Sequence, residues 1–215
     1  MFVLSWGPMA ENPPPGSGDV ERGRPGRPSL GDELLTLVRE RAYTRAAEPF
    51  LLASGALSYD YVDMRRAVAR GVDLQIAARA VIDHLIRIGV DYDAIGGMTM
   101  GADPVSHAVA LLAAKGWFSI RKDEKTHGNR RRLEGIDVAG CRVVLFEDTA
   151  STGGSILEAF DVAAGAGANV VHACVLFDRG DSARAAFAAR GVPYSSLLDY
   201  RDLGIEPIVP PPAGE

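Results

Sequence analysis

Two acidic residues and a run of small polar residues follow one another at the end of an apolar, β-prone segment. Residues 143–155 have the sequence VVLFEDTASTGGS, and the first four predict a strand that is buried on both faces. Glu147 and Asp148 come next, directly before the polar turn. Carboxylates in that place can accept hydrogen bonds from the hydroxyls of a bound sugar, whereas inside the turn they would repel an anion.

The turn that follows the acids has the composition of an anion site. It leads into a predicted helix over residues 156–164, whose N-terminus presents unpaired backbone N–H groups at the positive end of the helix dipole. Gly153 and Gly154 let a phosphate approach the backbone. Hydroxyl donors come from Ser151, Thr152 and Ser155. An anion site beside acceptors for hydroxyls predicts a sugar-phosphate site.

Two better-known phosphate motifs do not fit the same residues. No Lys follows the glycines, as a Walker loop requires, and the glycines lack the Gly-x-Gly-x-x-Gly spacing of a dinucleotide site. The simpler alternative is an ordinary strand, turn and helix in which a Ser caps the helix.

A strongly basic run separates two predicted strands. Residues 121–132 read RKDEKTHGNRRR, with six cations and a His in an otherwise acidic chain, and the absence of apolar periodicity predicts a loop. Alone, the run would fit a solvated loop or a nonspecific polyanion patch. Beside a sugar-phosphate site, its side chains could neutralise the negative charge of a phosphorylated ligand.

An Asp-Arg pair ends the apolar strand predicted over residues 169–177. The C-terminal edge of a parallel sheet is where α/β proteins bind ligands. Arg179 would present a planar fork there, suited to a carboxylate or an imide oxygen. The alternative is a surface Arg that caps a helix.

These segments together resemble a known family. Residues 143–155 resemble the phosphoribosyl-pyrophosphate (PRPP) signature of type I phosphoribosyltransferases, and RKDEKTHG at 121–128 resembles the flexible catalytic loop of the orotate phosphoribosyltransferases. The Ser-Gly turn with the following Tyr and Asp-x-Arg, within residues 54–65, is similar to the hood segment of the same family. The chain departs from the pattern at Ala53 and Met100, where some members carry a cation.

The resemblance implies transfer of ribose 5-phosphate from PRPP to orotate. By this resemblance the catalytic residues would be Lys125, His127 and Asp148. Those that bind PRPP would be Arg121, Lys122, Lys125, His127, Glu147, Asp148, Thr149, Ala150, Ser151, Thr152, Gly153, Gly154 and Ser155. Ser151 and Arg179 would bind orotate.

The resemblance also implies partners. Mg2+ would be carried mainly by PRPP, since small hard cations take phosphate oxygens and water, so we assign no metal ligand in the protein. The family implies a homodimer in which the basic loop reaches the partner's site. Two alternatives stay open: the same chemistry on another pyrimidine or a specialised heterocycle, and a non-catalytic PRPP sensor that could bind RNA.

The elements that must position these residues predict one α/β domain of the type I phosphoribosyltransferase fold, a central parallel sheet flanked by helices with a small N-terminal hood. We expect a disordered tail over 1–28 with Met9 as an alternative start, the domain over 29–206, and a loose tail over 207–215. The expected N-terminal elements are a helix from a Ser29–Asp32 capping box to Ala47, a hairpin over 50–65 and a helix of about 17 residues whose periodic apolar positions run from Leu74 to Ile88. Next come a strand at 94–97, a helix over 105–114 capped by Asp103, a strand at 117–120, and after residue 177 a helix over 182–190, a strand at 194–198 and a helix near Leu203.

Composition narrows the function classes. A net charge of −5 does not suit a nucleic-acid binder. Cys141 and Cys174 show no metal or disulfide spacing, and Cys174 lies within an apolar strand. No apolar run has the length of a membrane span, and residues 1–9 lack the features of a signal peptide, so we expect a cytoplasmic protein. His84 and His107 are assigned no role.

Overall fold

A six-stranded sheet forms the centre of the molecule. The computed structural model describes residues 28–52, 55, 57–123 and 132–209. The strands are β3 (Ala94–Met98), β4 (Gly116–Ile120), β5 (Leu133–Gly135), β6 (Arg142–Ala150), β7 (Asn169–Asp178) and β8 (Tyr194–Asp199). Their order is β5-β4-β3-β6-β7-β8, and all pairs are parallel except β4 with the edge strand β5. The predicted α/β class is confirmed, whereas β5 was not predicted because a three-residue strand has no periodicity to detect.

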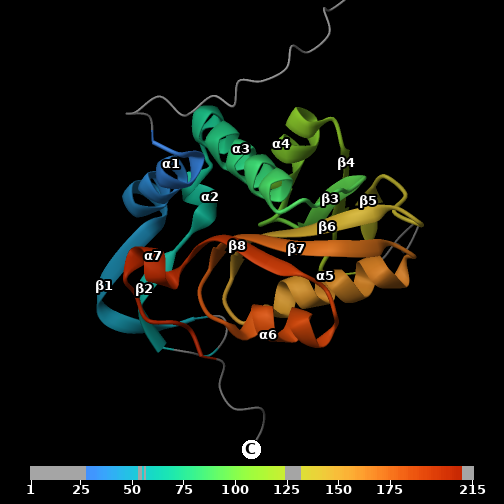
Figure 1. The fold of residues 1–215 in the computed structure, drawn as a ribbon. Helices are drawn as coiled ribbons and strands as arrows, with labels where there is room; N and C mark the ends of the chain where they lie inside the picture. Colours follow the sequence, from blue (N-terminus) through green and yellow to red (C-terminus); the bar gives the residue numbers. More distant parts are fainter. Residues whose placement is uncertain (1–27, 53–54, 56, 124–131, 210–215) are drawn as a thin grey trace, which may run out of the picture.

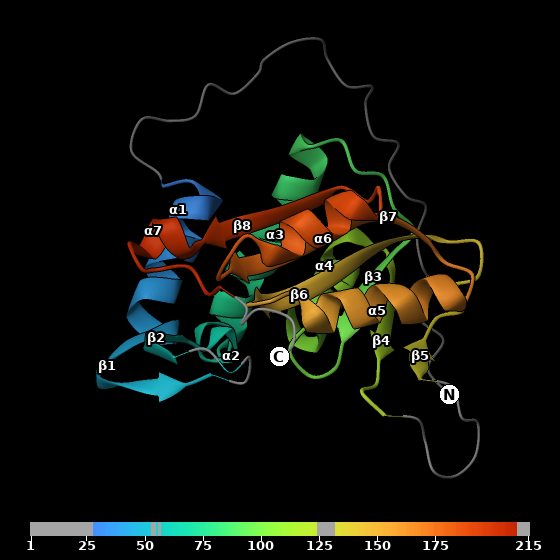
Figure 2. The ribbon, with the colours of Figure 1, turned by 90° about the horizontal axis from the view of Figure 1, so that it is seen from below.

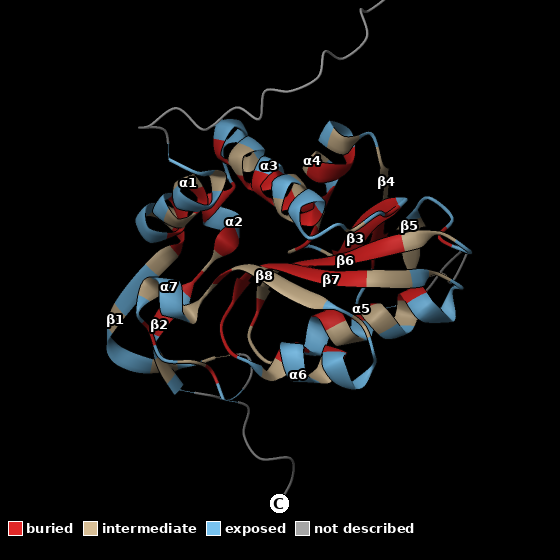
Figure 3. Cartoon of the chain, viewed as in Figure 1, coloured by how far each residue is buried: buried red, intermediate tan, exposed pale blue. Residues whose placement is uncertain are grey.

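Helices cover both faces of this sheet (Figure 1). Helices α3 (Gly71–Arg87) and α4 (Asp103–Ala113) lie on one face, and α5 (Gly154–Gly165) and α6 (Ser182–Ala189) lie on the other. Along β6, Val144 and Phe146 pack with the first pair of helices, and Val143 and Leu145 pack with the second. The centre of the sheet is therefore buried on both sides, as predicted (Figure 3).

The N-terminal part forms a separate hairpin. Helix α1 (Leu30–Leu37) begins at the predicted Ser29–Asp32 capping box and passes through a π-helical turn, η1 (Val38–Ala42). Strands β1 (Tyr43–Leu51) and β2 (Leu57–Val62) then pair antiparallel, followed by the short helix α2 (Met64–Ala67). This hairpin, which we call the hood, projects beyond one end of the main sheet (Figure 2).

Two local predictions in this fold were wrong. The first helix does not continue to Ala47, because the chain from Tyr43 pairs with β2, and the Tyr43 hydroxyl donates to Asp60 at 2.8 Å. Asp103 does not cap α4 but is its first residue. Its carboxylate accepts hydrogen bonds from the hydroxyls of Thr99 (2.6 Å) and Ser119 (2.8 Å) instead. In both places a partner distant in the sequence or on another strand outweighs the local signal.

The C-terminal segment returns to the hood side of the domain. After α7 (Tyr200–Leu203) the chain runs without regular structure to residue 209. Ile208 is buried, and its N–H donates to the carbonyl of Arg179 at 2.7 Å, so the packed domain extends two residues beyond the predicted boundary at 206. Residues 1–27 and 210–215 lie outside the described part. No helix in the described residues is long and apolar enough to cross a membrane.

Two histidines share one hydroxyl between α3 and the sheet. Nε2 of His84 and Nε2 of His172 each lie 2.7 Å from Oγ of Ser195. A hydroxyl donates one hydrogen bond and accepts others, so two neutral rings satisfy it. Burial lowers the pKa of both rings, that of His172 to about 4, and Arg87 adds to the effect on His84. The cluster therefore requires neutral rings.

We predict that His172 makes the protein sensitive to acid. Because its pKa is lowered in the folded chain, its contribution to stability is complete above the ordinary histidine pKa and is lost as the pH falls toward the folded value. The unfolding free energy should fall by about 2 kcal/mol between about pH 7 and about pH 5 through this residue. Urea unfolding of the wild type and of His172→Gln measures the difference, with the exposed His107→Gln as control. Equal pH dependence in wild type and His172→Gln would contradict the prediction.

Candidate functional site

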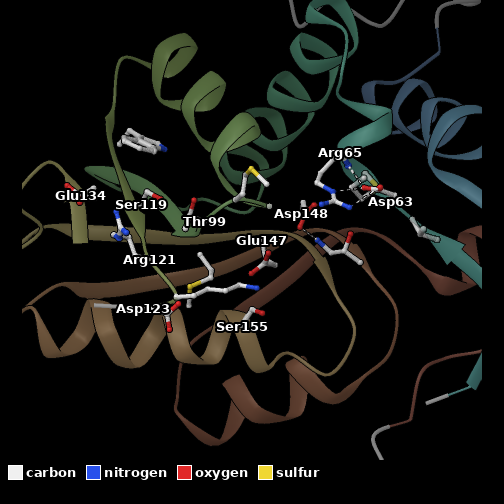
Figure 4. Close-up of a pocket in the computed structure, with 18 of the residues that line it drawn as sticks. Asp63, Arg65, Thr99, Ser119, Arg121, Asp123, Glu134, Glu147, Asp148 and Ser155 are labelled. Atoms are coloured by element: carbon white, nitrogen blue, oxygen red, sulfur yellow. Dashed lines mark hydrogen bonds and ion pairs between the residues drawn. The ribbon is translucent and has the colours of Figure 1, made fainter. Parts of the chain in front are cut away.

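Two adjoining pockets open where strands β3, β6 and β7 end. The larger, which we call the cleft, has a volume of about 820 Å3, and the smaller, which we call the cup pocket, about 380 Å3. Residues lining both are Tyr61, Val62, Glu147, Thr149 and Ser155. Figure 4 shows the cleft, with Asp63 and Arg65, which follow β2, at one end and Arg121 and Asp123, which follow β4, at the other. The site thus lies at the sheet edge that the sequence predicted.

The cup pocket is built by the turn from β6 into α5. Gly153 has φ 82° at the N-terminus of α5, and a Cβ there would lie 2.8 Å from the Cβ of Ala183, so only glycine fits. No side chain among the described residues caps α5. The alternative of a simple Ser-capped helix is therefore wrong, and the N–H groups of the first turn are left for a ligand beside the hydroxyls of Ser151, Thr152 and Ser155.

Both acids at the end of β6 line the cleft. Glu147 is 6% exposed, and its Oε2 has no hydrogen-bond partner among the described residues. Oδ1 of Asp148 accepts the N–H of Thr149 at 2.8 Å. Burial, followed by the neighbouring charge of Asp148, raises the pKa of Glu147 well above its ordinary value, and burial also raises the pKa of Asp148. The unliganded site therefore favours a proton on Glu147, which hydrogen-bond donors of a ligand would replace.

The turn after β3 approaches these acids closely. A Cβ on Gly101 would lie 2.5 Å from Oδ1 of Asp148 and 3.1 Å from Oε1 of Glu147. The Thr99–Met100 peptide of this turn is cis. Met100 is 67% exposed and lines the cleft, so no cation stands there. The close approach of Gly101 to these acids was not predicted, because they lie far along the chain.

Cations line the cleft from two directions. Arg121 and Lys122 follow β4, and Lys122 favours the charged form of Glu147. The N–H of Arg121 donates to the carbonyl of Arg132, and Nε of Arg132 donates back to the carbonyl of Arg121, each at 2.8 Å. These bonds hold together residues that flank 124–131. Lys125 and His127 lie outside the described residues.

Arg65, in helix α2 directly after the hood, is the second cation near the acids. Its Nε and Nη2 donate to the two oxygens of Asp63 at 2.8 and 3.0 Å, and it stands next to Asp148 (Figure 4). Its charge favours the ionised form of Asp148, although burial is the larger effect on that pKa. The Asp-x-Arg pattern included Asp63 and Arg65, but it did not indicate that Arg65 lies next to Asp148.

Arg179 reaches the cup pocket from the end of β7. It is 2% exposed, and its Nη1 donates to the carbonyl of Asp60 in the hood at 2.9 Å. Burial lowers its pKa, and the charge of Asp60 opposes that shift. The alternative of a surface Arg capping a helix is therefore wrong. Every predicted site residue within the described part of the chain lines one of the two pockets.

The described lining of the cleft contains more acids than cations. The acids are Asp63, Asp123, Glu134, Glu147 and Asp148, and the cations are Arg65, Arg121 and Lys122. Within the described residues, no group of three or more His, Cys, Asp or Glu side chains could hold a metal ion. A polyanionic ligand would therefore need further positive charge here, from the rest of the basic run or from a cation that it carries.

Comparison with known proteins gives a consistent result. No protein-family model matches the chain. A curated relative from Corynebacterium glutamicum strain R, named orotate phosphoribosyltransferase, is 41% identical over 180 residues, which cover 80% of this chain and 93% of the relative. The crystal structure of Mycobacterium tuberculosis H37Rv orotate phosphoribosyltransferase in complex with Fe(III) dicitrate has a TM-score of 0.69 and 35% identity, and covers 82% of this chain and 100% of that one. The structure of the same protein in complex with PRPP has a TM-score of 0.68 and 33% identity over 82% and 100%.

We predict that Glu147→Gln flattens the pH dependence of stability in the unliganded protein. Because the pKa of Glu147 is raised on folding, the folded chain keeps a proton that the unfolded chain loses above the ordinary carboxyl pKa. Wild-type unfolding free energy should therefore fall through this residue as the pH rises toward the folded pKa, by up to about 1.4 kcal/mol per pH unit. The amide of Glu147→Gln does not titrate in this range, so the variant lacks this contribution to the pH dependence.

Urea unfolding at several pH values between about 5 and about 8 measures this difference. Glu40→Gln, at an exposed carboxyl of η1, is the control. The prediction fails if wild type and Glu147→Gln keep a constant difference in unfolding free energy over that range.

Proposed function

The chain belongs to the orotate phosphoribosyltransferase family, and we propose that it transfers the 5-phosphoribosyl group of PRPP to orotate, forming orotidine 5′-phosphate and pyrophosphate. The observation that carries this proposal is that the two pockets join at the buried carboxyl of Glu147, next to Asp148 in the cleft. One pocket offers a cup of amides and hydroxyls together with Arg179, and the other offers cations. An activated sugar phosphate and an acceptor base need these groups in that arrangement.

The reaction exchanges one bond at the anomeric carbon of ribose. The bond to pyrophosphate breaks, and its electron pair leaves with the pyrophosphate oxygen. A ring nitrogen of orotate supplies the electron pair of the new bond, and the proton of that nitrogen passes to pyrophosphate or to solvent. Positive charge develops on the ribose ring while negative charge develops on the leaving group. The protein can accelerate this step without a covalent intermediate, by positioning the reactants and stabilising the separating charges.

The cup and the acid pair would hold the two sides of the ribose. The first-turn amides of α5 and the surrounding hydroxyls suit the 5′-phosphate, with residues Thr149, Ala150, Ser151, Thr152, Gly153, Gly154 and Ser155 forming the cup. Glu147 and Asp148 suit the ribose hydroxyls, whose donors would satisfy the unpartnered Oε2 of Glu147. The structure of the M. tuberculosis relative with PRPP supports a PRPP site in this fold.

The base would lie between the hood and the end of β7. Arg179 and Ser151 line the cup pocket together with Tyr61 and Val62 of β2. A buried guanidinium with an unpartnered Nε needs an acceptor, which a carboxylate or an imide oxygen of orotate can provide.

Mg2+ fits the charge balance of the cleft. The excess of acids in the described lining, together with the unpartnered oxygen of Glu147, favours a ligand that arrives with a cation. Glu147 and Asp148 would face such a cation through the ribose hydroxyls, and Mg2+ carried mainly by PRPP would supply positive charge next to the pyrophosphate.

Cations of the basic run would stabilise the leaving group. Arg121 and Lys122 line the cleft, and Lys125 and His127 follow them in sequence. We propose that these four side chains bind the pyrophosphate as its charge grows and exclude water that would hydrolyse PRPP. We further propose a homodimer, as the family resemblance implies, and a cytoplasmic location.

A panel of acceptor bases tests the proposed function. Purified protein with PRPP and Mg2+ should consume orotate, followed by its absorbance, and release pyrophosphate in equal amount. Turnover with another base alone would assign a different acceptor, for which the exposed Met100 leaves room. PRPP binding without pyrophosphate release from any base would overturn the enzymatic proposal in favour of a sensor.

Replacing Lys125 with Ala should lower kcat much more than it weakens PRPP binding. Its charge is required as pyrophosphate leaves, so we expect a loss of about 100-fold in kcat with a Kd for PRPP changed by less than about fivefold. Steady-state kinetics and calorimetry measure the two quantities. Lys115→Ala is the matched control, because Lys115 lies over the ring of Tyr92, which lines neither pocket. An unchanged kcat in Lys125→Ala would refute this role.

A further inference from the structure

The guanidinium of Arg179 is held by the hood rather than by its own strand. Nη1 donates to the main-chain carbonyl of Asp60 at 2.9 Å, and Nη2 lies 3.4 Å from Oγ of Ser58. These partners are 119 and 121 residues away in the sequence. The direction of a side chain at the end of β7 is therefore fixed by strand β2.

One edge of this guanidinium remains available to a ligand. Nε of Arg179 has no hydrogen-bond partner among the described residues, although the side chain is buried. In a guanidinium, Nε–H and one N–H of Nη2 lie side by side and can bind two acceptor oxygens together. With Nη1 bound to Asp60, this edge is free for a ligand in the cup pocket, which Arg179 lines.

Ser58 fixes the carbonyl that holds Arg179. Its Oγ donates to the carbonyl of Asp60 and accepts the N–H of the same residue, both at 3.0 Å. The contact from Nη2 of Arg179 is a second one that this oxygen can accept. The hydroxyl of Ser58 therefore acts both on the guanidinium and on the main chain to which it is bound.

Asp60 connects this arrangement to the rest of the hood. Its Oδ1 accepts the hydroxyl of Tyr43 at 2.8 Å and Nη1 of Arg45 at 3.1 Å, both from β1. Its charge also favours the charged form of Arg179. Arg45 and Arg179 carry two positive charges and Asp60 carries one negative charge. The net charge of +1 suits an anionic base.

We propose that Ser58 and Asp60 are positioning residues that orient Arg179 toward the base, so that strand β2 of the hood sets the affinity for orotate. This inference rests on the proposed function, in which Arg179 contacts orotate. In this proposal the hood orients the side chain of Arg179, at the end of β7, in addition to covering the base.

Kinetics of Ser58 variants test the proposal. Ser58→Ala should raise KM for orotate about tenfold while KM for PRPP changes by less than about twofold, because only the base contacts Arg179. Ser58→Thr keeps the hydroxyl on a strand that accepts β-branched residues, and should restore KM for orotate. Thr36→Ala, which removes an exposed hydroxyl bonded to a main-chain carbonyl of α1, is the control. Equal rises of both KM values in Ser58→Ala, or no rise, would overturn the proposal.

A measurement without substrate separates this inference from the proposed function. The Arg179 Nε–H signal in heteronuclear NMR spectra is identified by its loss in Arg179→Lys. Rotation about the Nε–Cζ bond should be slow in the wild type and about tenfold faster in Ser58→Ala and in Tyr43→Phe, which removes one of the two side-chain hydrogen bonds from β1 to Asp60. Unchanged rotation would refute the positioning role even in an active enzyme. Absence of orotate turnover in the wild type, with rotation altered as expected, would refute the proposed function alone.

Discussion

The burial of the Glu147 carboxyl beside Asp148 at the end of β6 is the constraint on which the rest of the site depends. Glu147 is almost excluded from water, and one of its oxygens has no hydrogen-bond partner in the described residues. Such a group is stable only with a proton or with a ligand that supplies donors or positive charge. A side chain at position 101 would collide with this pair unless the carboxylates moved, and Lys122 and Arg65 supply charge near it. The turn after β3 and both cation sources are therefore arranged around the acids.

The hood adds a second requirement, which concerns geometry rather than charge. The sheet edge by itself places the end of β7 near the cup, but it does not determine where the guanidinium of Arg179 points. That direction comes from β2, while the C-terminal segment holds the main chain of Arg179 through the hydrogen bond from the N–H of Ile208 to its carbonyl. Segments from the beginning and the end of the domain thus meet at one residue, β2 through its side chain and the C-terminal segment through its main chain.

Sequence reasoning identified what depends on local pattern. Apolar runs and periodicity predicted the sheet and the 17-residue helix α3, and the order of acids, hydroxyls and glycines predicted the cup. It could not find features that depend on distant partners. Tyr43 leaves the first helix to bind Asp60, Asp103 accepts from Ser119 rather than capping α4, and Arg179 is held by Ser58 and Asp60. Lys125 and His127, predicted with equal force, lie outside the described residues and remain predictions.

Charge is distributed unevenly between the cup pocket and the cleft. The cup offers neutral amides and hydroxyls to a phosphate, while the described lining of the cleft has more acids than cations. Six cations are concentrated in residues 121–132. Dipoles can hold a phosphate equally in the ground state and in the transition state, whereas cations beside the leaving group act more strongly as its charge grows. Substrate affinity and leaving-group stabilisation would therefore be assigned to different segments, so that either can change without loss of the other.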